Sequence, residues 1–542
     1  ISARLWQGLR FIIGTMKGGN RMTIIATEIQ KWKRNKIVWC ILALTLLLGV
    51  FAIERACSIS RSSPFMDSFG DLYTLAFKNL SSLFLPIVLG MYFLTKESYR
   101  NVLLLAASLF FYAWGEPVYV LVMILSIVIN YIYGLKIGTE DETKRKRALV
   151  GGIVINLALL GVFKYSGFFM ENVNAVFGLE VEVKKLPLPI GISFYTFQSI
   201  SYLVDIYRRV CPPQKSLIKM GLFISFFPQL IAGPILKYYD IAAQIDNRKV
   251  SLPLFNQGAV RFLQGLAKKI IIANIMAKTA DEIFALGIND ISTPMAWIGI
   301  VAYTFQIYFD FSGYSDIAIG TAKLLGIKLM KNFDYPYISR NIAEFWRKWH
   351  ISLTTWFRDY IYIPLGGSRV GKWKSVRNTF IIFLVSGFWH GANWTFICWG
   401  LFHALLFLPL LLTSSNRKYR GIVAEGKLLP SWKEAIQIGT TFFLVVIGWI
   451  LFRAENMEQA IGYIGRLFSM QQSTGNMPSH SLEVGLYILL FWILEWFQRD
   501  KPYALQIQFL KSKSLRVAIL TFVILFIEIT MGKSSEFIYF QF

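Results

Sequence analysis

The chain has 542 residues, of which 55% are hydrophobic and 16% aromatic, and its mean hydropathy is +0.49. Its formal net charge is +24, from 56 Lys and Arg residues against 32 Asp and Glu residues. The basic residues lie largely in short loops between apolar runs, a pattern that orients membrane helices and argues against nucleic-acid binding. The four cysteines are scattered and indicate neither a disulfide framework nor a thiol active site. The main basic clusters are Lys31–Lys36, Lys144–Arg147, Arg208–Lys219 and Arg417–Arg420.

The amino-terminal segment differs from the rest of the chain. The codons of Lys17-Gly18-Gly19, just before Met22, can spell a purine-rich ribosome-binding site, so we expect residues 1–21 to be translated upstream sequence. Residues 22–70 are expected to be an N-terminal extension. Within it, a basic flank precedes the apolar run Ile37–Phe51 and no small-residue cleavage site follows, as is typical of a signal anchor.

Apolar runs that can be extended toward the bilayer-spanning length of about 20 residues recur along the whole chain. They are continuous, whereas the strands of a membrane barrel would alternate, so helices are expected to satisfy the backbone in lipid. The sequence therefore predicts an all-α polytopic membrane protein, with residues 71–542 as its transmembrane domain and about a dozen membrane-embedded helices. The runs are Ile37–Phe51, Leu83–Leu94, Val118–Tyr133, Ala148–Phe163, Phe380–Trp389, Phe442–Phe452, Leu486–Trp496 and Val517–Ile529.

Residues 305–369 form a central segment in which charged residues interrupt short apolar stretches. Such charge density does not face lipid and favours re-entrant or interfacial helices around a cavity. Large apolar side chains recur at three- and four-residue spacing over Ile342–Tyr360, with Glu344 and Asp359 on the other side, which predicts one amphipathic helix. His350 would project from the edge of its aromatic face toward protein.

The start of this segment, Tyr308 to Asp316, gathers several polar side chains, among them Asp310, Tyr314 and Asp316. These residues would line a polar cavity or orient a histidine. The alternative is a helix break whose polar groups satisfy one another. The residues alone favour neither interpretation.

The chain has four histidines: His350, His390, His403 and His480. An ionisable ring at membrane depth costs a few kcal/mol, so we interpret His390, at the end of an apolar run, as functional rather than as a hydrogen-bonded structural residue. Gly387 and Gly391 would let another backbone or a substrate approach its ring.

The other histidines give weaker signals. For His403 the structural role is favoured, and His480 is expected to be exposed in a polar loop. No histidine has a partner at metal-ligand spacing, and no G-x-S-x-G elbow is present, which argues against a metal site and a serine hydrolase of that type.

Three segments together resemble the membrane-bound O-acyltransferase (MBOAT) family: residues 308–320, 340–367 and 386–394. The resemblance is to the branch that contains the alginate O-acetylation membrane protein and the teichoic-acid D-alanyl transfer protein. Gly-Ala-Asn-Trp after His390 and Pro-Leu-Gly-Gly from Pro364 are closer to the alginate type. The likeness runs from about Leu80 to the carboxyl terminus.

The resemblance implies a ring of tilted helices around a thinned centre, with a tunnel leading to a catalytic histidine. His390 matches the essential histidine of the family, and His350 matches its second active-site position. The remaining candidates for lining the tunnel or supporting the site are Asp310, Tyr314, Asp316, Trp346, Trp389 and Asn393.

The chemistry that the resemblance implies is acyl transfer without a metal or a permanently bound cofactor. A neutral imidazole, favoured by burial, takes the proton of an acceptor hydroxyl and returns it to the leaving thiolate. His350 would polarise the thioester carbonyl or orient the acceptor.

The resemblance also implies partners and a location. The donor would be acetyl-CoA or an acyl carrier protein, and the acceptor an exopolysaccharide or cell-wall glycan, reached through an extracytoplasmic SGNH-type acetyltransferase at a bacterial plasma membrane. Membrane lipid would surround the chain. Two alternatives stay open: D-alanyl transfer to teichoic acid, and a non-catalytic glycan or lipid transporter.

Overall fold

The computed structural model describes residues 84–183, 186–470, 480–503, 507 and 510–530. The upstream sequence expected at residues 1–21 and the signal anchor expected at residues 22–70 lie outside the described residues.

The chain divides into two compact units. The first is Ile1–Leu94 with Ser251–Asn256, and the second is Thr95–Val250 with Gln257–Phe542. Among the described residues of the first unit, Phe84–Leu94 forms a short apolar helix, and the ring of Phe93 lies 6.0 Å from that of Phe255.

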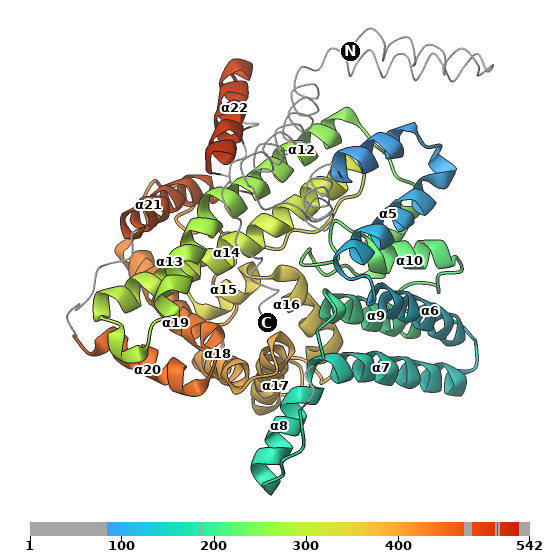
Figure 1. Ribbon diagram of the computed structural model, residues 1–542, viewed down its shortest axis with the longest axis horizontal. Helices are drawn as coiled ribbons and strands as arrows, with labels where there is room; N and C mark the ends of the chain where they lie inside the picture. The colour runs from blue at the N-terminus through green and yellow to red at the C-terminus, as the bar shows by residue number, and fades with distance from the viewer. Residues whose placement is uncertain (1–83, 184–185, 471–479, 504–506, 508–509, 531–542) are drawn as a thin grey trace, which may run out of the picture. The chain divides into compact units, whose positions relative to one another are not determined.

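From Thr95 onward the described residues form helices and no strand (Figure 1). Two of the helices continue into π-helical turns, η2 (Lys268–Ala273) and η5 (Arg358–Tyr362). Three 3-10 turns lie at Glu97–Tyr99, Ile288–Asp290 and Pro336–Ile338. The α-helices are α5 (Arg100–Gly115), α6 (Val120–Ile137), α7 (Glu142–Lys164), α8 (Ser166–Phe177), α9 (Ile192–Tyr207), α10 (Leu217–Ser225), α11 (Tyr238–Asp246), α12 (Leu252–Ala267), α13 (Asn274–Phe284), α14 (Thr293–Leu324), α15 (Ile342–Lys348), α16 (Ile351–Phe357), α17 (Lys372–His390), α18 (Trp394–Leu412), α19 (Trp432–Arg453), α20 (Met457–Phe468), α21 (Ser481–Gln498) and α22 (Lys513–Thr530).

Phe84–Leu94 and the later apolar runs lie in helices, apart from Val118–Tyr119, which form a turn before α6, whereas Ile37–Phe51 and Leu83 are outside the described residues. Five of the described helices are long and apolar enough to cross a membrane: α6, α7, α18, α19 and α21. The others are shorter or more polar, so fewer helices meet this standard than the dozen embedded helices that we expected. The protein is an all-α, multi-pass membrane protein, as predicted.

Three basic clusters meet at one end of the helices of the second unit, which we call the basic end. Lys144–Arg147 begins α7, and Arg145 donates a hydrogen bond to the carbonyl oxygen of Tyr207 (2.7 Å), beside the cluster Arg208–Lys219. Further contacts join that cluster to the third, Arg417–Arg420. They run from Arg208 Nη1 to the carbonyl oxygen of Asp359 (3.0 Å), from Tyr362 to Ser375 (2.9 Å between the oxygens) and from Arg417 Nη2 to Ser368 Oγ (3.1 Å).

The central segment differs from the prediction in two respects. Helix α14 runs unbroken for 32 residues through the polar stretch, so no helix break lies there. The single amphipathic helix predicted over Ile342–Tyr360 is instead broken between α15 and α16, where His350 has a φ of 45°. Asn332 explains the break, because its backbone oxygen accepts the N–H of Ile351 (2.9 Å) and its side chain accepts that of Ser352 (3.2 Å). A continuous helix would have paired these N–H groups internally.

The polar side of the predicted helix is not a solvent face, contrary to its amphipathic pattern. Glu344 is only 1% exposed, and its carboxylate pairs with Arg340 (3.0 Å) and Lys348 (3.1 Å). Asp359 pairs with Lys237 at the basic end. At the α15 end, Arg347 donates to the carbonyl oxygen of Asn416 (2.8 Å), next to the cluster Arg417–Arg420, so both ends of the α15–α16 pair lie near basic loops. Their junction packs inside, since the ring of Trp349 lies 5.0 Å from that of Trp449 on α19, which agrees with the predicted re-entrant helices.

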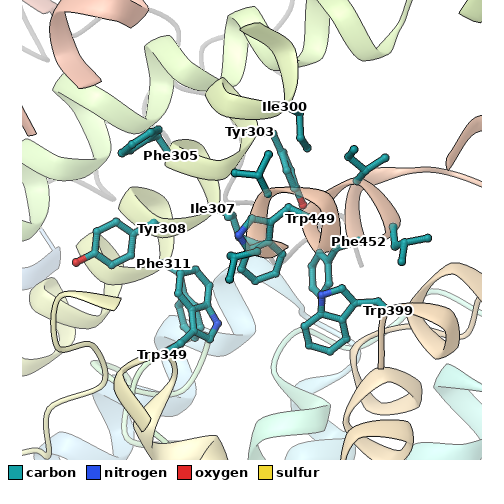
Figure 2. Packing of buried hydrophobic residues seen from close by; sticks show 14 of the residues in the cluster. Ile300, Tyr303, Phe305, Ile307, Tyr308, Phe311, Trp349, Trp399, Trp449 and Phe452 are labelled. Atoms are coloured by element: carbon teal, nitrogen blue, oxygen red, sulfur yellow. The ribbon is translucent and has the colours of Figure 1, made fainter. Parts of the chain in front are cut away.

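An aromatic core surrounds this junction (Figure 2). Phe311 comes from α14, Trp399 from α18, and Trp449 and Phe452 from α19. The rings of Trp399 and Phe452 lie 5.2 Å apart, and those of Trp399 and Trp449 lie 6.2 Å apart. These rings bury a large apolar area and leave little room for water.

Candidate active site

Helices α17 and α18 form a tight hairpin that ends at His390. A Cβ atom on Gly387 would lie 2.2 Å from the carbonyl oxygen of Phe396, and one on Gly400 would lie 2.3 Å from that of Phe383. The two backbones therefore touch where neither residue has a side chain. We predicted that glycine lets another backbone approach His390, and this backbone is that of α18.

The His390 side chain is 7% exposed and lies among aromatic rings. Its ring centroid is 4.9 Å from Trp389, 5.2 Å from Trp399 and 5.0 Å from Phe452, each in an edge-to-face arrangement. Such walls exclude water and favour the uncharged imidazole.

Lys164 holds the end of the helix that carries His390. Its Nζ donates to the carbonyl oxygens of Trp389 (2.6 Å) and His390 (2.9 Å), which no later turn of α17 satisfies. Our sequence reasoning missed Lys164, although a single lysine closing the apolar run Ala148–Phe163 was a usable signal. Because α7 starts at the basic end and Lys164 is 22 residues further on, His390 lies at the opposite end, about 33 Å away.

His350 is buried at the junction of α15 and α16, with 1% of its surface exposed. Its Nδ1 lies 3.1 Å from Asn332 Oδ1, and its ring stands edge-on to Phe311 at 4.6 Å. Its Nε2 is buried and has no hydrogen-bond partner among the described residues. The two imidazoles are near enough for a charge on His350 to act on His390. The fold thus brings together two histidines that are 40 residues apart in the sequence.

The predicted tryptophans lie beside the histidines. Trp389 stacks on Phe197 of α9 at 5.1 Å, and Trp346 stands edge-on to His403 at 4.9 Å. His403 is 1% exposed and is packed rather than hydrogen-bonded, since neither ring nitrogen has a partner within the described part of the chain. The indole N–H groups of Trp346, Trp389 and Trp399 are also buried there without a described acceptor.

The predicted carboxylates are paired with cations on α12 and the following π-helical turn. Asp310 lies 2.7 Å from Lys269, and Asp316 lies 2.5 Å from Arg261 and 2.9 Å from Lys268. The polar groups of this stretch are therefore not satisfied by one another at a helix break, as the alternative had it, because α14 is continuous and the partners of its carboxylates come from other elements. Tyr314 is half-buried and packs against the aromatic core.

Asn393 and His480 begin helices. The Asn393 side chain accepts the N–H of Thr395 (3.1 Å) as the N-cap of α18 and donates to the carbonyl oxygen of Glu455 (2.7 Å). His480 precedes α21, with Nδ1 3.2 Å from Glu483, and a third of its side chain is exposed. Within the described residues, no three His, Cys, Asp or Glu side chains gather as metal ligands would.

Comparison with known proteins gives the family. Residues 192–448 match the model of the MBOAT, membrane-bound O-acyltransferase family. The chain is 44% identical over 425 residues to the probable alginate O-acetylase AlgI of Pseudomonas aeruginosa, which covers 77% of this chain and 79% of that protein. The chain belongs to the membrane-bound O-acyltransferase family. The resemblance read from three segments is confirmed, and this MBOAT protein is an O-acyltransferase.

Two other relatives of this acyltransferase are more distant. It is 38% identical over 412 residues to the peptidoglycan O-acetyltransferase of Helicobacter pylori, covering 70% of this chain and 76% of that protein. It is 31% identical over 281 residues to the teichoic acid D-alanyltransferase of Bacillus subtilis, covering 49% of this chain and 69% of that protein. A second model, the ABC-2 family transporter protein, matches residues 24–99, a range that contains the expected boundary between residues 70 and 71.

Proposed function

We propose that this acyltransferase moves an acetyl group from a cytoplasmic thioester to the far side of a bacterial plasma membrane, for O-acetylation of an exopolysaccharide or cell-wall glycan. The relatives named for O-acetylation are 44% and 38% identical to the chain, against 31% for a D-alanyltransferase. The choice of acetyl over alanyl rests on this difference. The observation that carries the proposal is the place of His390, buried beside His350 at the end of α17 away from the basic loops.

The charge distribution supports the direction of transfer. Loops rich in Lys and Arg stay in the cytoplasm, so the basic end of the helices would face the donor. Acetyl-CoA and an acyl carrier protein are both cytoplasmic thioesters that fit this side. His390, about 33 Å from that end along α7, would then be close to an acceptor that arrives from outside.

The proposed chemistry needs only the imidazoles. Neutral His390 takes the proton of the acceptor hydroxyl while the hydroxyl oxygen attacks the thioester carbonyl. The C–S bond then breaks, and the protonated ring returns its proton to the leaving thiolate. The products are an O-acyl ester and a free thiol, and His390 ends as it began. His350 acts on the acceptor or the carbonyl.

Unpartnered polar atoms around the histidines support a tunnel for the donor. A buried polar atom without a partner costs roughly 1–3 kcal/mol, so several such atoms around one site indicate a space that a polar ligand fills. Here they are His350 Nε2, the three indole N–H groups and the His403 nitrogens. A narrow path with aromatic walls would also protect the thioester from hydrolysis. An extracytoplasmic SGNH-type acetyltransferase would pass the group on to the glycan.

The test is His390→Ala in a strain that lacks its own copy of the gene, with His480→Ala as the matched control. We expect His390→Ala to reach the membrane and to abolish glycan O-acetylation, measured by mass spectrometry of surface glycans, while His480→Ala retains it. Normal acetylation with His390→Ala would overturn the catalytic role and favour the non-catalytic transporter. If the surface glycan of the complemented strain carries alanyl instead of acetyl groups, the transferred group is alanyl, and the alternative of D-alanyl transfer to teichoic acid is favoured.

A further inference from the structure

The neighbours of Asn332 determine whether the oxygen or the nitrogen of its side-chain amide faces His350. Its Oδ1 lies 3.2 Å from the backbone nitrogen of Ser352, 2.9 Å from Ser352 Oγ and 3.1 Å from His350 Nδ1. The backbone N–H of Ser352 can only donate, so the amide atom that faces it is the oxygen. The Asn332 nitrogen points the other way, toward Ser315 Oγ at 3.2 Å.

The same oxygen faces His350 Nδ1, and an oxygen acceptor requires a proton on that nitrogen. A neutral imidazole carries one N–H, so Nε2 then holds a lone pair. This Nε2 is the buried ring nitrogen that has no partner within the described part of the chain. Asn332 is itself 1% exposed, which removes water as a competing partner for its oxygen.

We propose that Asn332 is a positioning residue that fixes His350 in the Nδ1–H tautomer, so that Nε2 is presented to the reaction as a hydrogen-bond acceptor. This proposal rests on the proposed function. It selects between the two roles expected for His350, because a lone pair cannot polarise a thioester carbonyl oxygen. Nε2 instead orients the acceptor by accepting a hydrogen bond from one of its hydroxyl groups, while His390 deprotonates the hydroxyl that reacts.

The backbone adds a second constraint on the ring. His350 has a φ of 45°, a left-handed conformation that few residues other than glycine adopt. It is held because the next two backbone N–H groups, of Ile351 and Ser352, donate to Asn332. One asparagine therefore determines both where the ring stands and which nitrogen carries the proton.

The experiment compares three variants of the full chain in cells that lack their own copy of the gene. Asn332→Leu removes the acceptor at similar size, Asn332→Asp keeps an oxygen at the Oδ1 position, and Ser352→Ala is the matched control. Ser352 Oγ bonds both Asn332 and the backbone N–H of Ile235 (3.0 Å), and it also lies 3.4 Å from His350 Nδ1. Ser352→Ala therefore disturbs the same packing and removes the more distant of two oxygens near that nitrogen, while the Asn332 oxygen at 3.1 Å stays in place. The readouts are the rate of glycan O-acetylation per amount of membrane protein, and the Tm of the purified protein.

We expect Asn332→Leu to lower the rate by about a hundredfold, the size of a lost acid–base or orienting contact. Asn332→Asp and Ser352→Ala should keep most of the rate, even if the Tm of Ser352→Ala falls as far as that of Asn332→Leu. In a His350→Ala background, Asn332→Leu should cause no further loss, because both changes remove one function.

The positioning role is overturned if the rates simply follow Tm, or if Asn332→Asp is as inactive as Asn332→Leu. Should Asn332→Leu fail to reach the membrane, Asn332→Gln carries the same expectation, since it keeps the amide but displaces the oxygen. Full activity of Asn332→Leu beside inactive His390→Ala would sink this proposal alone. Activity of His390→Ala itself would instead sink the proposed function.

Discussion

Among single residues, Gly387 and Gly400 determine how closely α17, which ends at His390, approaches α18. Gly387 and Gly400 each face a carbonyl oxygen of the opposite helix at a distance that no Cβ atom tolerates. A side chain added at either position would therefore displace α17 or α18 and so disturb the hairpin that bears His390.

Gly387→Ala should destabilise the protein and reduce acyl transfer. The new Cβ would lie 2.2 Å from the carbonyl oxygen of Phe396, so the helices must separate, at a cost of about 1–3 kcal/mol for overpacking. Gly439→Ala in α19 is the control, because nothing lies within 4 Å and alanine favours a helix over glycine by up to about 1 kcal/mol. The Tm of the purified variants measures their stability, and the extent of glycan O-acetylation measures acyl transfer. Equal Tm values for Gly387→Ala and Gly439→Ala would contradict the close packing of α17 and α18.

At the scale of elements, Lys164 joins α7 to the end of α17. Lys164→Met should lower both Tm and acetylation, because two carbonyl oxygens lose their donor and a buried polar group left without a partner costs roughly 1–3 kcal/mol. Lys146→Met makes the same change at an exposed position of the same helix and should alter neither. Lys164→Arg, which can donate to both oxygens, should restore part of the activity. Unchanged acetylation in Lys164→Met would show that α17 keeps its place without this bond.

The α15 element carries a pH-dependent contribution to stability. Burial acts to raise the pKa of Glu344, but hydrogen bonds from Arg340 and the charge of Lys348 outweigh it and hold the pKa below its ordinary value. Because the folded-state pKa is lower than that of the unfolded chain, the pairing stabilises the fold above the ordinary pKa of a glutamate. The stabilisation is lost as the pH falls through the folded-state value.

Glu344→Gln should therefore have a lower Tm than the parent protein at pH 7, with a gap that narrows in acid below the ordinary glutamate pKa. The exposed Glu425→Gln is the control and should show no comparable gap at any pH. The measurement is the Tm of the purified proteins across this pH range. A gap that is constant or widens in acid would contradict the assigned direction.

The helices and the histidine on α17 could be predicted from the sequence, because long apolar runs and an ionisable ring at the end of one are local signals. The break at His350 could not. The spacing from Ile342 to Tyr360 is compatible with one helix, and only contacts from Asn332, 18 residues earlier, divert the backbone. The role of Lys164 was missed for the same reason, since its partners on α17 are more than 200 residues away in the sequence. The ion partners of Glu344 do lie at four-residue spacing, but its burial depends on the packing of the helices around α15 and could not be read from that spacing.

For the whole molecule, the gathering of basic loops predicts its orientation in the membrane. In a variant without the native cysteines, Lys418→Cys at the basic end should react with a membrane-impermeant maleimide only after the cells are opened. Glu455→Cys, beyond the far end of α19 and bonded through its carbonyl oxygen to Asn393, should react in intact cells. Both side chains are exposed. The reverse labelling pattern would invert the proposed direction of acyl transfer.

The distribution of the histidines has a consequence for chemical probing. Three of the four are nearly inaccessible, whereas a third of the His480 side chain is exposed. A small histidine-directed reagent such as diethyl pyrocarbonate therefore meets one ready target and three that it reaches only through the interior. The extent of modification at His350 and His390, relative to that at His480, therefore measures how accessible the interior is to a small molecule. A ligand that occupies the interior should lower the modification of His350 and His390 without lowering that of His480.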